Sequence, residues 1–325
     1  MNTELIRRCE LLVNNRKAIQ SAFKWDSETL SLAGSSFYVG LDMEADTEKL
    51  KACENILKRK AGIFSEYRGN LKMPFLCKMA VAEDPERYFE EIDSIVKQMK
   101  ALKWIETSYK VMAAITLHDY LTMDQMPAAI NKMVALYQGM KANHPWITSG
   151  EDVPFAAILA ASEIDTETLN NEMENCYREL STCFHDKNAV QSLSHILAIN
   201  PADTLTKCYS VEKIYSLLKE KKHKYAAGYE LAVLGTLSML DMPVEKIVED
   251  IIEADEYLKG QKGFGNLSMG EEMRRMYAAL MVMDTYMPPA AHSHESLVDS
   301  VLVFVITMEV CMLILMTAVI TTSSN

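Results

Sequence analysis

The feature that most constrains the fold is an alternation of two helix types with a period of about forty residues. Five lysines lie at the ends of amphipathic runs and are separated by one or two of these periods: Lys58, Lys100, Lys141, Lys219 and Lys259. The six runs predicted in this way are 47–60, 85–103, 126–142, 166–184, 210–221 and 243–259. Apolar residues recur at helical spacing within each run, which predicts an amphipathic helix.

Each amphipathic run is followed by a second segment that is more apolar and richer in small residues. These segments are 73–82, 108–121, 153–162, 188–199, 225–240 and 273–286. Small side chains such as those of Ala113 and Ala114 allow neighbouring helices to approach closely. Because neither helix type can bury its apolar face alone, the sequence predicts an all-α fold of about six stacked helical hairpins, similar to a solenoid.

The chain divides into three predicted parts. We predict a helical cap for residues 1–45 and the hairpin array for residues 46–290. For residues 291–325 we predict a hydrophobic C-terminal helix that packs on the array. Only 12 glycines and 9 prolines occur in 325 residues, fewer than average, which favours long helices. Four of those glycines lie at 260–270, which predicts a loose connection inside the last hairpin.

Residues 301–320 leave two alternatives open. Thr307, Glu309 and Thr317 are the polar residues of this stretch, and twenty helical residues span about 30 Å, the thickness of a bilayer core. A charge at Glu309 disfavours insertion into a membrane. Burial in the groove of the array is therefore favoured over a tail anchor.

Charge and cysteine usage exclude some functions. The formal net charge is −12, and nucleic-acid binding depends mostly on Lys and Arg, so no nucleic-acid partner is expected. The seven cysteines are scattered and include no C-x-x-C pair, which predicts reduced thiols that fill core volumes in a cytoplasmic protein. The first fifteen residues contain four charged side chains and do not resemble a secretory signal.

One stretch has the composition of a functional site. Residues 143–152 include three candidate catalytic residues, His144, Glu151 and Asp152, because an imidazole near carboxylates can transfer protons or bind a metal. The candidate ligand-binding residues are Arg68, Trp146, Thr148 and His195. The favoured alternative is structural: Thr148 or Ser149 caps the next helix, and Trp146 packs within the hairpin.

His292 and His294 are weak metal candidates, with Glu295 as a third ligand. The sequence contains no nucleophile elbow, zinc-binding helix, P-loop or dinucleotide-binding fingerprint, and no cofactor is expected.

Four stretches of the sequence are familiar from a known family: 143–152, Phe64-Ser65 with Arg68-Gly69, 84–86 and 191–197. Through these residues the chain resembles an uncharacterised bacterial family, domain of unknown function 4003, over residues 49–286. The resemblance implies a bacterial, cytoplasmic protein and brings no activity with it.

Two functions from different classes are therefore open. The favoured hypothesis is a non-catalytic scaffold that holds a protein or peptide in a concave groove, with the acidic balance favouring a basic or amphipathic partner. The alternative is an enzyme or a small-molecule or metal binder with a pocket between inner helices near His144, Glu151 and Asp152. A third possibility is a scaffold tethered to a membrane by residues 301–320.

Overall fold

The computed structural model describes residues 2–24, 28–63, 65–69 and 71–286. Fourteen α-helices and two short 3-10 helices occur in these residues, and this part of the chain contains no strand. The prediction of an all-α fold is confirmed.

The six amphipathic helices begin 38 to 41 residues apart. They are α3 (Thr47–Lys60), α5 (Pro85–Gln98), α7 (Met126–Asn143), α9 (Thr166–Leu180), α11 (Thr204–Glu220) and α13 (Val244–Lys259). The apolar helices between them are α4 (Lys72–Val81), α6 (Thr107–Tyr120), α8 (Asp152–Ala161), α10 (Lys187–Leu197), α12 (Leu231–Leu237) and α14 (Glu271–Tyr286). The chain starts with α1 (Thr3–Ala22) and α2 (Glu28–Gly40), and the 3-10 helices are η1 (Glu66–Arg68) and η2 (Met99–Ala101).

The described residues form two compact units. The first unit contains residues 2–17, 35–44 and 172–286, and the second contains 18–34 and 45–171, so the division falls within α1, α2 and α9. The three predicted parts, with boundaries at 45 and 290, stay a prediction.

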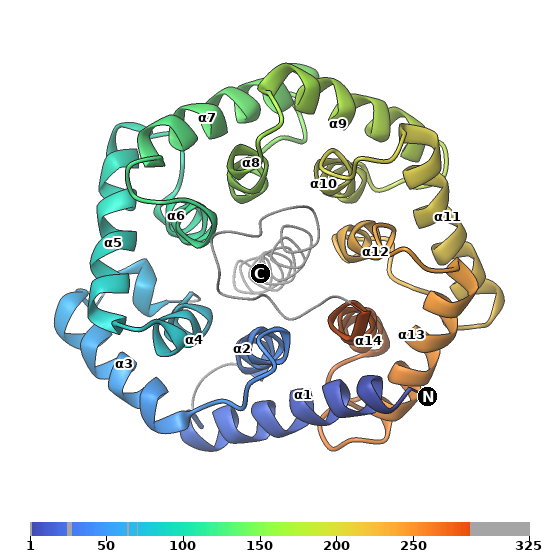
Figure 1. Ribbon diagram of the computed structural model, residues 1–325, viewed down its shortest axis with the longest axis horizontal. Coiled ribbons are helices and arrows are strands. Elements are labelled where there is room, and N and C mark those ends of the chain that lie inside the picture. The colour runs from blue at the N-terminus through green and yellow to red at the C-terminus, as the bar shows by residue number, and fades with distance from the viewer. Residues whose placement is uncertain (1, 25–27, 64, 70, 287–325) are drawn as a thin grey trace. The chain divides into compact units, whose positions relative to one another are not determined.

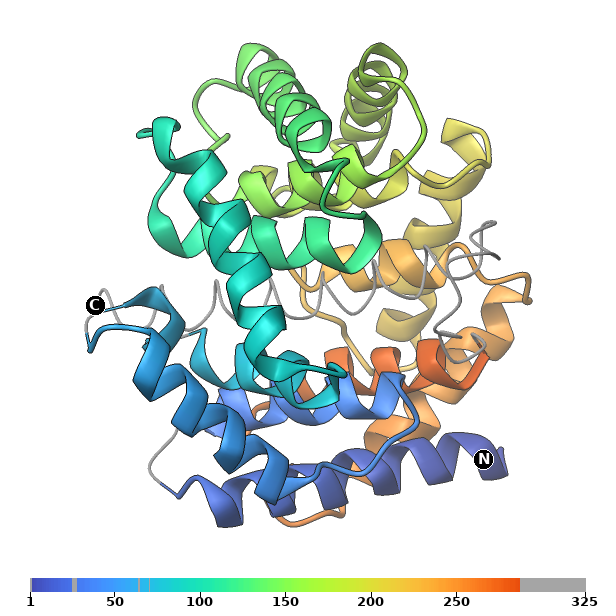
Figure 2. The ribbon, with the colours of Figure 1, turned by 60° about the vertical axis from the view of Figure 1, so that its left-hand side comes forward.

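Within the second unit, successive helices alternate between two layers. Helices α3 and α5 contact one another in the first layer, α6 and α8 contact one another in the second, and α7 packs on α8 (Figure 1). Figure 2 shows α3 and α5 side by side from another direction. The first unit follows the same plan, because α11 contacts α13 in one layer and α12 contacts both α10 and α14 in the other.

Burial follows the sequence pattern of each helix type. Helix α5 buries Phe89, Ile92 and Ile95 on one face and exposes Glu90 and Lys97 on the other. By contrast, all nine residues of the segment 152–160 in α8 are buried, and so are all seven residues of α12. The two layers therefore differ as the residues predict: a two-faced helix borders solvent, and an apolar helix has neighbours on every side.

Amphipathic helices of one layer contact each other at a nearly constant separation in sequence. In the second unit, the ammonium of Lys60 lies 2.7 Å from the carboxylate of Glu90, thirty residues later. In the first unit, Thr204 contacts Glu172 and Asp255 contacts His223, and both pairs are 32 residues apart. Since the helices start about forty residues apart, each residue contacts a position about six to eight residues nearer the start of the next helix.

Two predicted helices have different limits in the structure. Helix α11 begins six residues earlier than predicted, because Asp203 caps it by accepting a hydrogen bond from the amide of Thr206. Helix α12 has seven residues instead of sixteen, and residues 225–230 form bends and turns before it. The sequence pattern located both helices but not their ends, which local side-chain hydrogen bonds determine.

Among the described residues, no helix is both long enough and apolar enough to cross a membrane. The predicted C-terminal helix, the stretch 301–320, and the metal candidates His292 and His294 lie outside the described residues.

Candidate functional site

The predicted segment 143–152 forms the connection between α7 and α8, and hydrogen bonds hold it in place. The amide of His144 donates to the carbonyl of Met140 at 2.8 Å, and the Thr148 hydroxyl donates to the same carbonyl at 3.1 Å. The ammonium of Lys141 donates to the carbonyls of Pro145 and Thr148, each at 2.7 Å. Both ends of the loop are thus attached to the last turn of α7.

Ser149 and Asp152 cap the start of α8 reciprocally. The Asp152 carboxylate accepts a hydrogen bond from the amide of Ser149 at 2.8 Å, and the Ser149 hydroxyl accepts one from the amide of Glu151 at 3.2 Å. The first of these bonds is the one that the acidic residue of a capping box makes, with an aspartate in place of the usual glutamate. Burial raises the pKa of Asp152 to about 7, so a large part of this carboxyl is protonated at neutral pH.

Trp146 is the most unusual residue of the segment. Its side chain is 96% exposed, although an indole is one of the largest apolar side chains. The expectation that Trp146 packs within the hairpin is therefore wrong. A hydrogen-bonded loop presents this ring to solvent at the end of α7.

The remaining sequence candidates occupy separate places. The guanidinium of Arg68 lies 3.5 Å from the carbonyl of Ala61, and both belong to the second unit. His195 is buried on α10 in the first unit. The catalytic role suggested for His144, Glu151 and Asp152 stays a prediction, as does ligand binding by Arg68, Thr148 and His195.

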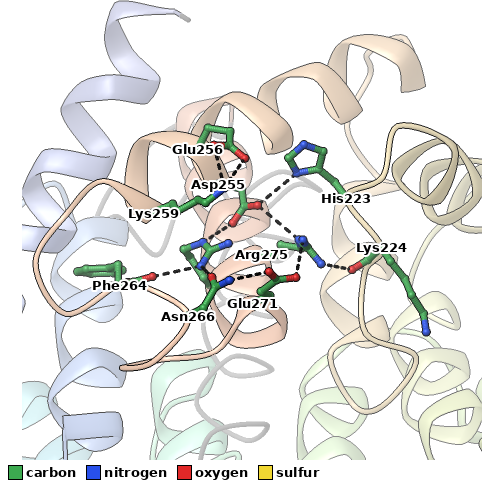
Figure 3. A network of polar contacts seen from close by, with 10 residues as sticks. His223, Lys224, Asp255, Glu256, Lys259, Phe264, Asn266, Glu271 and Arg275 are labelled. Carbon is green, nitrogen blue, oxygen red and sulfur yellow. Dashed lines mark hydrogen bonds and ion pairs between the residues drawn. The ribbon is translucent and has the colours of Figure 1, made fainter.

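The structure reveals a larger polar network that the sequence analysis missed. Its centre is Asp255 on α13, a fully buried carboxylate (Figure 3). One oxygen accepts a hydrogen bond from Nε of Arg274 at 2.6 Å, and the other lies 3.4 Å from Nε of Arg275 and 3.3 Å from Nδ1 of His223. Asp255 and Arg274 are each only 1% exposed, so this ion pair is strongly shielded from water.

Arg274 also holds the glycine-rich connection between α13 and α14, and Arg275 holds the segment that follows α11. Arg274 donates to the carbonyl of Phe264 at 3.3 Å and to the side-chain oxygen of Asn266 at 2.6 Å. Arg275 donates to the carbonyl of Lys224 at 2.6 Å, which attaches the segment that follows α11 (Figure 3). The network therefore joins α13, α14 and the connection between them to the segment that follows α11.

Arg16 of α1 holds the connection from another direction. Its guanidinium donates to the carbonyl of Gly263 at 2.6 Å and lies 4.8 Å from the centre of the buried Phe264 ring. Gly263 has a φ of +88°, a conformation that glycine adopts without strain. The prediction that residues 260–270 form a loose connection is wrong, because hydrogen bonds and the Phe264 ring hold them.

The network contains one group of side chains with the spacing of a metal site. Among the described residues, potential ligand atoms of His223, Asp255 and Glu256 lie within 4.8 Å of one another. Arg274 and Arg275 already contact both oxygens of Asp255, and Lys259 lies 3.3 Å from Glu256. Three positive charges beside these carboxylates oppose a divalent cation, so the group is better explained as a structural ion-pair network.

One sequence signal could have suggested this network. The Arg274-Arg275 doublet lies in the first turns of an apolar helix, where cations are unfavourable unless an acidic partner is nearby. The partner itself, Asp255, could not be chosen from the sequence because α13 contains several carboxylates.

Comparisons with known proteins identify relatives without a described activity. The model of a family described as "Protein of unknown function (DUF4003)" matches residues 15–314. The match confirms the resemblance found in the sequence and extends beyond it at both ends. "Uncharacterized protein YeaA" of Bacillus subtilis (strain 168) is 23% identical over 256 residues, which cover 75% of this chain and 77% of that protein. No solved structure matches the chain.

Proposed function

The chain belongs to the DUF4003 family of proteins of unknown function. We propose that it is a non-catalytic helical-repeat scaffold that binds a protein partner through Trp146. The finer fold assignment, a solenoid-like row of about six hairpins, is part of the proposal. Its support is the spacing of 38 to 41 residues between amphipathic helices and the two-layer packing within each unit.

The exposure of Trp146 carries the proposal. Leaving an indole in water forgoes a few kcal/mol of hydrophobic stabilisation, so a fully exposed tryptophan is more easily explained as a binding residue than as a packing residue. Tryptophan is also among the residues that most often dominate binding at protein interfaces.

The loop around Trp146 favours binding because it is already ordered. Lys141 and Thr148 fix the backbone on both sides of the indole through hydrogen bonds to carbonyl groups. A partner would therefore lose little conformational entropy from this loop on association. The net charge of −12 favours a partner whose surface is basic around an apolar pocket.

The polar clusters support a non-catalytic role. In the segment 143–152 the side chains of Thr148, Ser149 and Asp152 make hydrogen bonds with the backbone that cap helices. The Asp255 network consists of ion pairs that join α13, α14 and their connection. Both arrangements give rigidity to a scaffold.

Photo-crosslinking tests the proposal. A benzophenone amino acid is placed at position 146 of the full-length chain in its native cells, and in a control at the exposed position Ser181. We expect position 146 to crosslink to one protein that position 181 does not capture. We also expect Trp146→Ala to weaken binding of that protein, once purified, at least about tenfold. Equal crosslinking at both positions, or unchanged affinity of the variant, would contradict the proposal.

The stability of Trp146→Ala provides the control for folding. Since the indole is almost fully exposed, its removal is expected to leave the unfolding temperature unchanged. Trp104→Ala is the matched substitution, because that indole stacks on Tyr137 with ring centres 4.4 Å apart. If the scaffold binds its partner through Trp146, Trp146→Ala should lose binding and Trp104→Ala should keep it.

We also place the protein in the cytoplasm. The support is that the six cysteines of the described residues are free thiols, as is usual in a reducing compartment. Five of them are buried as expected, whereas Cys183 is exposed.

A further inference from the structure

The end of α11 in the first unit carries a dense group of exposed cations, which we call the lysine segment (residues 219–224). Lys219 lies in the last turn of the helix, Lys221 caps it, and Lys222 and Lys224 follow. All four side chains are exposed, and none forms an ion pair with a carboxylate in the part of the chain that the structure describes. The helix dipole attracts cations only within the last turn, so it does not account for Lys224.

The backbone of the lysine segment is fixed although its lysine side chains are exposed. The amide of Lys222 donates to the carbonyl of Lys219 at 3.0 Å, and the amide of His223 donates to the carbonyl of Leu218 at 2.8 Å. These are the two hydrogen bonds of a Schellman motif at the end of a helix. A partner would therefore find the lysines on an ordered turn and lose little conformational entropy from the backbone.

Lys222 has a backbone conformation that favours glycine. Its φ is +65°, and it occupies the position of the Schellman motif where glycine is most common. A side chain is strained at this φ because its Cβ lies close to the following carbonyl oxygen. The turn itself needs no side chain at this position, so the strain points to a use of the lysine.

An exposed apolar side chain is connected to the lysine segment. Leu267 is fully exposed and follows Asn266, whose amide donates to one oxygen of Glu271 at 2.7 Å. Arg275 contacts the other oxygen of Glu271 at 2.9 Å and donates to the carbonyl of Lys224 at 2.6 Å (Figure 3). Glu271 and Arg275 thus hold the two connections of the first unit beside each other.

We propose that the lysine segment and Leu267 form a docking surface for a short acidic peptide of a partner protein. Carboxylates of the peptide pair with the lysines, and an apolar side chain packs on Leu267. Charge complementarity identifies this occupant. Membranes and nucleic acids present extended negative charge, which the net charge of −12 and Glu220 within the segment oppose, whereas a short peptide contacts only the cations.

This inference is independent of the proposed binding through Trp146. Trp146 belongs to the second unit, and the lysine segment and Leu267 belong to the first. Trp146→Ala should therefore leave the affinity for the acidic peptide unchanged, so that failure of one proposal is distinguishable from failure of the other.

Fluorescence anisotropy with the full-length protein tests the inference. The probe is a labelled peptide with about eight glutamates around one leucine, and the control peptide has glutamine in place of every glutamate. We expect the acidic peptide to bind and the control peptide not to bind. Because the contacts are ionic and exposed, the affinity should fall at least about fivefold when the salt concentration rises from about 0.1 M to about 0.5 M.

Substitution of lysines locates the surface. The test variant replaces three lysines of the segment with glutamine: Lys221, Lys222 and Lys224. The matched control replaces three exposed lysines of the second unit in the same way: Lys49, Lys100 and Lys103. Both variants change the net charge equally. We expect the test variant to weaken binding at least about fivefold and the control to change it less than about twofold.

Two single substitutions separate binding from folding. Lys222→Gly relieves the backbone strain, so the unfolding temperature should stay equal or rise while the affinity falls about twofold. Leu267→Ala should weaken binding at least about threefold without a change in unfolding temperature, because the side chain is fully exposed.

Three outcomes would overturn the inference. The first is that the acidic peptide does not bind, and the second is that the test variant and its matched control lose affinity equally. The third is that the protein binds phosphatidylserine vesicles or single-stranded DNA through the same lysines but not the acidic peptide.

Discussion

A buried carboxyl group on α14 shows how one side chain can make the stability of this protein depend on pH. Asp284 is 3% exposed, and its Oδ1 has no hydrogen-bond partner among the residues that the structure describes. Burial raises the pKa of Asp284 to about 7, although attraction by Arg8 acts in the opposite direction. The folded state therefore holds this carboxyl protonated at a pH where an unfolded aspartate has lost its proton.

Asp284→Asn is expected to stabilise the protein most at high pH. Below about pH 4 the carboxyl is protonated in both the folded and the unfolded state and makes no difference. As the pH rises from about 4 to 7, only the unfolded state releases the proton, so the folded wild type loses up to about 4 kcal/mol of stability. Asparagine cannot ionise and avoids this loss.

Denaturant unfolding of both proteins at pH 4.5 and pH 8 measures the effect. The advantage of the variant should grow by roughly 2–4 kcal/mol between these values, and Asp241→Asn at an exposed position should show no such growth. An advantage of Asp284→Asn that is equal at both values would show that the carboxyl does not titrate in this range.

At the scale of elements, the connection between α13 and α14 depends on Arg274. Replacing Arg274 with Met leaves Asp255 buried with less positive charge beside it, which is expected to cost about 3–5 kcal/mol of stability. It also removes the hydrogen bonds to Phe264 and Asn266, so trypsin should cleave after Lys262 faster than in the wild type. Arg178→Met, at an exposed position of α9, is the control and should change neither quantity.

The conformation of the same connection gives a second prediction. Gly263→Ala is expected to cost at least about 1–2 kcal/mol, because a side chain is strained at a φ of +88° and the new methyl group would lie 2.8 Å from the Arg16 guanidinium. Gly265→Ala introduces a methyl group with no atom within 4 Å and should be nearly neutral. Equal unfolding temperatures for the two variants would contradict the role given to Gly263.

At the scale of the whole molecule, the proposed packing of residues 301–320 can be tested by truncation. The polar residues of this stretch are Thr307, Glu309 and Thr317, and the burial of so apolar a segment against apolar helices would be favourable. We expect a chain that ends at Asp299 to unfold at a temperature several degrees lower than the full chain. Fractionation of cells distinguishes the alternative: a full chain in the membrane fraction and a truncated chain of equal stability would favour an anchor.

The helices could be predicted from the residues alone, because the signals for a helix are local. The spacing of apolar residues marks a helix face, and Asp186 caps α10 by accepting hydrogen bonds from the amides of Asn188 and Ala189 within the same turn. The family also followed from the sequence, since residues such as 143–152 are recognisable without coordinates.

Which polar residues contact one another depends on the packing of the helices and could not be predicted. Asp255 and His223 are 32 residues apart, as are Thr204 and Glu172, and these contacts depend on how far each helix is shifted along its neighbour. A period of about forty residues does not specify that shift. The exposure of Trp146 was likewise undetermined, because an aromatic residue in a loop can fold onto the protein or point into water, and the hydrogen bonds around the loop decide which.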